Sequence, residues 1–190
     1  LQDVAYYVSL EGPQNELIFK DAADYKKYGE LLAKFKDEFQ FKLYAYALLP
    51  MRLELLIEAT EDHPISEIMQ KITPSYTKYY NHRYQRKGTL FQKRFRSIIL
   101  EKDSYLLALT RFVHLAPFRV HAGEDGMKLA QTSYGAYVNE SPLTPGGISV
   151  NMNSEISEVK AKLLEVGNVS SYEQYEQAID KVELELFDKK

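Results

Sequence analysis

Hydrophobic residues recur at two spacings along the first 117 positions, and each spacing predicts a different element. Apolar runs and alternations bounded by turn residues such as Pro50 predict strands, because side chains alternate between the two faces of a sheet. Apolar residues three or four positions apart predict helices. Strands are expected at residues 4–10, 42–49, 52–59 and 95–100, and helices from Asp21, from Ile65 and from Asp103.

Two prolines and one aspartate set the expected helix boundaries. Asp103 is expected to cap the third helix and Pro117 to stop it, while Pro74 is expected to kink the second helix by removing one backbone hydrogen bond. The resulting order, β-α-β-β-α-β-α, predicts an α+β fold of ferredoxin-like type, with one antiparallel sheet and helices packed on one face.

The hydrophobic pattern weakens after Gly123, and this divides the chain. Residues 1–138 are expected to form the ferredoxin-like domain. Residues 139–153 contain the run SPLTPGG and read as a linker, and residues 154–190 are expected to form a small helical C-terminal extension that is polar and acidic.

Composition limits the class of protein. The chain of 190 residues is 45% hydrophobic, which suits one soluble domain with a real core. It has no cysteine, which excludes disulfides and thiolate metal sites. No apolar run is long enough to span a membrane and the start lacks the features of a signal peptide, so we expect a cytoplasmic protein with no membrane partner.

Residues 68–100, here called the basic band, contain eight bases and no acid. The net charge of the chain is −3, so the other residues sum to −11, because −3 minus 8 is −11. Tyrosines and phenylalanines lie between these bases, and this combination suits single-stranded nucleic acid; the alternative is a solvated basic helix face. The bases assigned to phosphates are Lys78, Arg83, Arg86, Lys87, Lys93, Arg94 and Arg96. Arg94 and Arg96 are expected to share a strand face.

Several segments in a fixed order carry a resemblance to a known family. They are FKLYAYALLP at 41–50, YYNHRY at 79–84, GTLFQKRF at 88–95, YLL at 105–107 and RFVHLAP at 111–117, with Ser133-Tyr134 near the end. Together they resemble the REP-associated tyrosine transposases, a group of single-tyrosine insertion-sequence transposases with a His-hydrophobe-His metal motif. The resemblance covers residues 4–138.

This resemblance implies a reaction and its partners. Two histidines on one strand would bind a divalent cation such as Mg²⁺ or Mn²⁺, which polarises the scissile phosphate of single-stranded DNA. A tyrosine on the last helix would attack that phosphate and form a covalent link. A polar residue one turn later would supply a third metal ligand. The family works as a dimer and recognises a DNA hairpin with a single-stranded flank.

The chain departs from the family at these chemical positions. Arg52 and Glu54 stand where the family has its two histidines, Phe112 stands where it has the tyrosine, and Ala116 stands where it has the asparagine. Arginine cannot ligate a metal and phenylalanine has no hydroxyl. We therefore expect no intact catalytic residues, no metal site and no cofactor.

Several roles stay open in the sequence. Arg52 and Glu54 share a strand face, so they form either an ion pair or, with Arg52 as a clamp, a phosphate site. Tyr105 is expected in the core, Tyr76 and Tyr79 in the core rather than stacked on bases, and His114 at the surface or an interface. The acidic extension is either a solvated helix face or a cover for the basic band.

The sequence predicts a transposase-like protein that binds single-stranded or hairpin DNA as a homodimer and does not cleave it. One alternative is an active metal-dependent transposase or nuclease that uses substitute residues. Another is a dimeric protein-interaction scaffold without DNA binding. RNA binding is a further alternative, because a basic, aromatic surface does not distinguish DNA from RNA.

Overall fold

The computed structural model describes residues 4–14, 16–119, 130–138 and 150–166. Strands and helices largely alternate along the chain, as the hydrophobic spacing predicts. The elements are β1 (Val4–Glu11), α1 (Ala22–Phe39), β2 (Lys42–Leu49), β3 (Arg52–Ala59), α2 (Ile65–Arg83), β4 (Arg96–Leu100), α3 (Lys102–His114), α4 (Ala116–Arg119), β5 (Gln131–Thr132), α6 (Tyr134–Tyr137) and α7 (Asn153–Val166).

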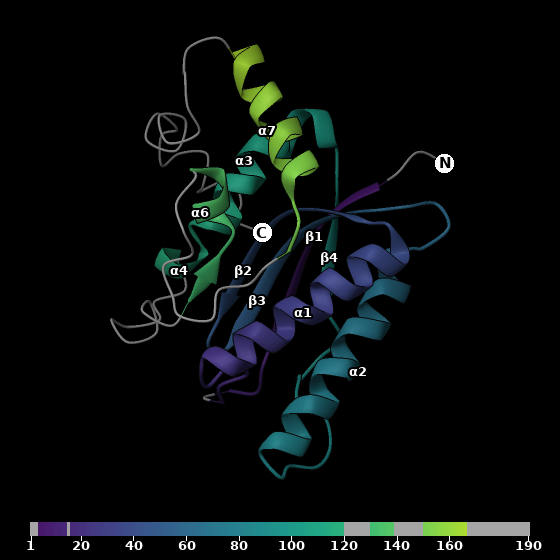
Figure 1. Ribbon diagram of the computed structural model, residues 1–190, viewed down its shortest axis with the longest axis vertical. Coiled ribbons are helices and arrows are strands. Elements are labelled where there is room, and N and C mark those ends of the chain that lie inside the picture. Colours follow the sequence, from purple (N-terminus) through teal and green to yellow (C-terminus); the bar gives the residue numbers. More distant parts are fainter. Residues whose placement is uncertain (1–3, 15, 120–129, 139–149, 167–190) are drawn as a thin grey trace.

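The strands form one antiparallel sheet in the order β4-β1-β3-β2-β5. Its first four strands have the ferredoxin-like order, and the short β5 extends the sheet beside β2 (Figure 1). The predicted α+β class with a ferredoxin-like antiparallel sheet is confirmed. The two β-hairpin strands β2 and β3 meet at Pro50, whose carbonyl accepts the backbone N–H of Ile18 at 2.7 Å.

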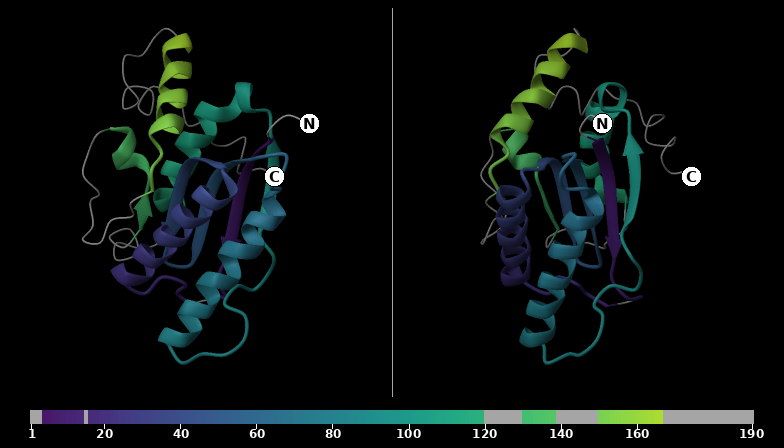
Figure 2. Two further views of the ribbon diagram at one scale, coloured as in Figure 1. Left: turned by 45° about the vertical axis from the view of Figure 1, so that its right-hand side comes forward. Right: turned by 90° about the vertical axis from the view of Figure 1, so that its right-hand side faces the viewer.

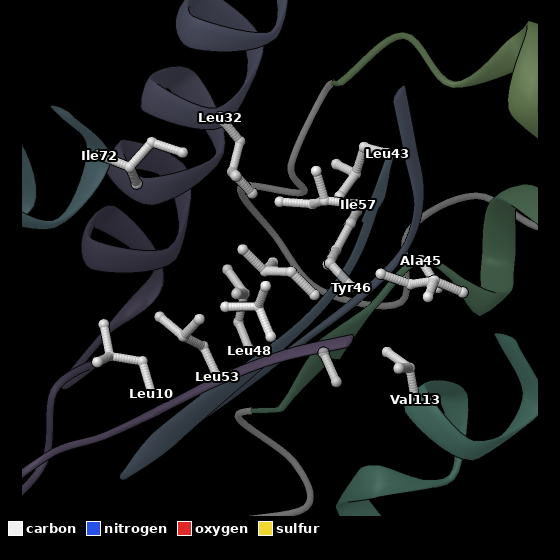
Figure 3. Close-up of a cluster of buried hydrophobic side chains, with 14 of the residues drawn as sticks. Leu10, Leu32, Leu43, Ala45, Tyr46, Leu48, Leu53, Ile57, Ile72 and Val113 are labelled. Carbon is white, nitrogen blue, oxygen red and sulfur yellow. The ribbon is translucent and has the colours of Figure 1, made fainter. Parts of the chain in front are cut away.

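Helices α1 and α2 cover one face of the sheet, as predicted, and α3 covers the other (Figure 2). In Figure 3, Leu32 of α1 and Ile72 of α2 lie on one side of the strands, and Val113 of α3 lies on the opposite side. The layer that α3 forms on the second face agrees with the burial of β2 and β3, which are buried along almost their whole length. Strands that are buried on both faces need cover on both faces.

The helix boundaries follow local chemistry, with one correction. Asp21 caps α1 by accepting the backbone N–H of Ala23 at 3.0 Å and of Asp24 at 3.3 Å. Helix α2 continues through Pro74 as one element. The prediction that Asp103 caps α3 is wrong, because Glu101 occupies the cap position and Asp103 lies in the first turn. Strand β4 ends at Leu100, so only one residue remains between strand and helix.

Helix α7 packs against the sheet within the predicted C-terminal extension. The buried carboxylate of Glu155 accepts the backbone N–H of Leu43 at 3.1 Å and pairs with Lys36 at 2.9 Å. Leu43 lies at an irregularity of the β2–β3 pairing, and Val159 and Leu163 of α7 are buried. Residues 153–166 therefore join the same body as the sheet. Of the predicted linker at 139–153, residues 139–149 lie outside the described residues, as do residues 167–190 of the extension.

Replacing Glu155 with glutamine is expected to destabilise the protein at pH 7 and much less at pH 3. Burial raises the pKa of this carboxyl, but hydrogen bonds from Ser154, Lys36 and Leu43 outweigh it, so the pKa is lowered overall. A lowered folded-state pKa means that the stabilisation is present above the ordinary value of 4.5 and is lost as the pH falls. We expect a loss of about 1.5–3 kcal/mol at pH 7.

Urea unfolding of both chains at pH 7 and pH 3 measures this difference. An equal loss at the two pH values would show that the charge of Glu155 is not what holds α7 on β2.

Candidate nucleic-acid interface

A buried carboxylate lies between two arginines on the sheet face that α3 covers. Arg52 and Glu54 are two residues apart on β3, so both side chains point to this face. Nη2 of Arg52 lies 2.8 Å from Oε1 of Glu54, which is fully buried. The predicted ion pair is therefore confirmed. Nη2 of Arg119 from α4 lies 2.7 Å from the other oxygen, Oε2. We call these three residues the Glu54 centre.

Phe112 and Tyr7 complete the surroundings of the Glu54 centre. The guanidinium carbon of Arg119 lies 3.4 Å from the centroid of the Phe112 ring, and Nη2 of Arg119 donates to the Phe112 carbonyl at 3.2 Å. The edge of Tyr7 meets the same ring at a centroid distance of 5.7 Å. Burial and the nearby charge of Glu54 raise the pKa of Tyr7, so its phenol stays protonated. The position of the family's nucleophile thus holds a ring that packs against a cation.

The Glu54 centre does not fit the divalent cation that the resembled family uses. Both oxygens of the one carboxylate are engaged by guanidinium groups, and two fixed positive charges repel a third. Ala116, at the third ligand position, is a buried methyl group. Across the ranges that the structure describes, no three His, Cys, Asp or Glu side chains gather where they could hold a metal ion.

The structure corrects two predictions on α3. His114, predicted at the surface or an interface, is buried, and its Nε2 lies 2.8 Å from Oγ of Ser133. That hydroxyl also accepts the backbone N–H of Tyr46 at 3.0 Å, so the pair joins α3 to β2. Tyr105, predicted in the core, is 46% exposed. His114 is covered by residues 133–137, whose rings Tyr134 and Tyr137 lie 5.7 and 5.0 Å from its own. Tyr105 lies in the first turn of α3, before the part of the helix that is buried against the sheet.

Arg83, a predicted phosphate contact, is held by two carboxylates of the α1 start. Its guanidinium lies 2.6 Å from Asp21 and 2.7 Å from the buried Asp24. The hydrogen bond with Asp21 is the largest cause of a raised pKa at Arg83. Asp24 also accepts the hydroxyl of Tyr84 at 2.8 Å and the backbone N–H of Lys20 at 2.8 Å. Arg83 therefore joins α2 to the start of α1.

Arg86 has a similar arrangement, with Nη2 at 2.9 Å from a carboxylate oxygen of Glu16. Its predicted contact with phosphate would therefore compete with an existing ion pair. The basic band is free of acids in the sequence, but the fold brings acids from residues 16–24 to its middle. This part of the band carries less uncompensated charge than its sequence indicates.

The tyrosines of α2 serve the core, as predicted for Tyr76 and Tyr79. Tyr76 donates to the carbonyl of Ile18 at 2.6 Å, and Tyr79 donates to Asp24 at 3.2 Å. Tyr80 is also buried, and its hydroxyl donates to the carbonyl of Leu17 at 2.5 Å. Tyr76 and Tyr80 hold the segment before α1 and are buried, whereas Tyr79 is half-buried and holds α1 itself.

The other predicted phosphate contacts are exposed and form no ion pair with any residue that the structure describes. They are Lys78, Lys87, Lys93, Arg94 and Arg96. Arg96 begins β4 and lies opposite Ser9 of β1. Arg94 precedes the strand, so the prediction that the two arginines alternate along it is wrong. Both nevertheless line one small hollow of about 50 Å³ beside Ser9, Lys93 and one acid, Glu11.

A larger groove of about 570 Å³ lies between α2 and residues 88–94. The side-chain amide of Asn81 donates to the carbonyl of Gly88 at 2.7 Å and so holds this segment to the helix. Gly88 has a φ of 88°, a conformation that favours glycine. No acid lines the groove, and its three cations are Lys78, Lys93 and Arg94. The structure thus gathers half of the band's cations around two adjoining cavities.

Helix α7 lies away from these cavities. It packs beside β2, whereas residues of α2, β1, β4 and 88–94 line the groove and the hollow. β2 and β4 lie toward opposite edges of the sheet, and Figure 1 shows α7 at the top and α2 at the lower right. The described part of the acidic extension therefore does not cover the basic band. No helix within the described ranges is both long enough and apolar enough to cross a bilayer.

Sequence reasoning missed Arg119 and the acids that pair with the basic band. Arg119 was missed because its contact with Glu54 spans 65 residues of sequence. The sequence contained one sign of a further partner, at Glu54. A buried carboxylate that pairs with a single arginine still has one oxygen that needs a hydrogen-bond donor.

The chain is similar in sequence to a known family and in fold to solved structures. The model of the family described as "Transposase IS200 like" matches residues 13–115. A solved structure of a REP-associated tyrosine transposase bound to a REP hairpin aligns with a TM-score of 0.59 at 12% identity, covering 80% of this chain and 89% of that one. A proposed transposase from Deinococcus radiodurans R1 aligns with a TM-score of 0.43 at 13% identity, covering 57% and 88%. None of the curated proteins matches this chain.

Proposed function

The chain belongs to the IS200-like transposase family, and from this premise we propose that it binds hairpin or single-stranded DNA without cleaving it. The proposal that the chain binds DNA rests on one observation. The acid-free groove with Lys78, Lys93 and Arg94 lies beside the hollow that Arg96 lines. These cations have no partner among the described residues and are exposed, so each can neutralise a phosphate. The similar fold bound to a REP hairpin supports the same class of partner.

The Glu54 centre supports the absence of cleavage. Phe112 lacks the hydroxyl that would attack a phosphate, and Arg119 lies against its ring. Tyr7 is near, but its raised pKa opposes formation of the phenolate. Glu54 neutralises the two arginines that would otherwise stabilise a phosphate transition state. A protein of this kind would occupy the DNA sites of active relatives without processing them.

An exposed sheet edge supports the homodimer. Among the described strands, β4 pairs only with β1, and its Ile98 and Ile99 are 59% and 70% exposed. An edge strand with exposed apolar side chains is a template for pairing with another chain. We propose that a second copy pairs there.

Binding to a labelled DNA hairpin with a single-stranded flank is expected to weaken steeply with salt. Four phosphate contacts at about −0.7 each give a log–log slope of about −3. Fluorescence anisotropy at several salt concentrations measures this slope, with a blunt duplex and the RNA equivalent as controls. The same DNA incubated with Mg²⁺ or Mn²⁺ is expected to stay intact and to form no covalent adduct with the protein.

Each rival function predicts a different result. Absence of salt-dependent binding to every nucleic acid would favour the protein-interaction scaffold. Cleavage that depends on metal would favour an active nuclease with substitute residues. Equal or tighter binding of the RNA hairpin would identify RNA as the partner.

A further inference from the structure

The chemistry of the larger groove indicates what part of a bound strand it takes. Building on the proposed function, we infer that the groove between α2 and residues 88–94 is a subsite for one unpaired DNA base, and that the adjoining hollow takes a neighbouring phosphate.

The size and lining of the groove suit a base. Its volume of about 570 Å³ lies within the range of small-ligand sites, roughly 300–1,000 Å³. Pro74, Leu90 and Phe91 give it apolar walls, and the latter two side chains are buried. Apolar and aromatic walls accept the face of any base, because every base has a π-face. The cations at the groove then face the backbone on either side of the base.

Polar side chains also line the groove, and Thr89 and Gln92 among them are exposed. The edge of a base carries hydrogen-bond donors and acceptors that such groups can meet, whereas an apolar peptide side chain does not.

The groove and the hollow form one path. Gln92, Lys93 and Arg94 line both cavities, so a strand seated in the groove meets the hollow across this segment. In the hollow, Arg96 lies opposite Ser9 on one side of β1. On the other side of β1, Ser9 lies opposite Glu54. A base in the groove would thus direct the next phosphates toward the Glu54 centre. The groove carries no acid, and the one acid of the hollow, Glu11, is paired with Arg52 at 3.4 Å, so the path as a whole favours an anionic strand.

A series of abasic DNAs tests the base subsite. The hairpin with a single-stranded flank is compared with copies that carry one abasic nucleotide at successive flank positions, so that phosphates and charge are unchanged. We expect about tenfold weaker binding at one or two positions, as stacking of a single base predicts. The salt slope should stay the same for all these DNAs, because the number of phosphate contacts does not change.

A variant that fills the groove links this loss to the groove itself. Thr89 is an exposed residue at the groove, and Thr89→Trp occupies the groove without changing charge. In this variant the parent and abasic DNAs should bind alike, which is the coupling that a double-mutant cycle detects. Tyr105→Trp, at the exposed start of α3, is the control and should keep the tenfold difference. Thr77→Leu, on the α2 wall, is a second filling variant should Thr89→Trp fold poorly.

The outcomes separate this inference from the proposed function. If DNA binds with a steep salt slope but every abasic DNA binds like the parent, the base subsite is wrong and the DNA-binding function stands. If the abasic loss persists in both filling variants, the base lies elsewhere on the protein. If no DNA binds with salt dependence, the proposed function itself fails.

Discussion

Replacing Glu54 with glutamine is expected to lower the free energy of unfolding by about 3–5 kcal/mol, as removal of one member of a buried ion pair does elsewhere. The change keeps the size of the side chain. It removes the buried carboxylate that pairs with the guanidinium groups of both Arg52 and Arg119, and leaves Arg52 with only the longer, exposed pair to Glu11 at 3.4 Å among the described residues. Both cations are mostly withdrawn from water, so neither can recover its hydration without moving. Urea unfolding at pH 7 measures the loss.

A matched control separates burial from charge. Glu67 pairs with His63 on the surface, with side chains 41% and 36% exposed, and Glu67→Gln is expected to cost at most about 0.5 kcal/mol. A triple replacement of the centre by Glu54→Leu, Arg52→Met and Arg119→Met should be neutral or stabilising, because apolar residues need no compensation. A loss below about 1 kcal/mol for Glu54→Gln would contradict a tightly coupled centre.

The Glu54 centre connects three elements of the fold. Arg119 connects α4 to β3 through Glu54 and to α3 through Phe112. Under the proposed function, this cation of the protein stands where the resemblance implies a metal ion. The residues at 52, 54, 112 and 119 form one set of contacts. Both arginines pair with Glu54, and Arg119 packs on the ring of Phe112.

Local periodicity was enough to predict the elements and one contact. The strands at 42–49 and 52–59 match β2 and β3, because strand patterns depend only on neighbouring residues. The ion pair of Arg52 and Glu54 could be predicted for the same reason: residues two apart on a strand share a face. The surroundings of His114 could not be predicted in this way, because the side chains that cover it come from residues 133–137, a contact that local periodicity does not reveal.

Charge patterns along the chain predicted the position of the candidate site but not its composition. Arg83 is separated by 59 residues from Asp24 and by 62 from Asp21, and such contacts depend on the packing of α1 against α2. The exposed cations Lys93 and Arg94 were predicted correctly to be accessible, while the sequence contained no sign of the groove beside them. Whether they bind phosphate stays a prediction.

Replacing Lys93 and Arg94 together with glutamine is expected to weaken binding of the hairpin DNA by about 10- to 100-fold near physiological salt. The two side chains line both cavities and have no ion pair among the described residues. Their loss should make the log–log salt slope less steep by about 1.4, which is two contacts at about 0.7 each. Stability should change little, because neither side chain is buried. Anisotropy titrations at several salt concentrations measure the affinity and the slope.

The control variant carries Lys26→Gln and Lys34→Gln, on exposed positions of α1, and has the same net charge as the test variant. If placement of charge determines binding, the control keeps the parental slope and nearly the parental affinity. Arg83→Gln provides a second contrast: it should lower stability, through the loss of its bonds to Asp21 and Asp24, while leaving the slope close to the parent's. Equal losses in the test and control variants would mean that net charge alone attracts DNA, and that neither cavity is a specific contact.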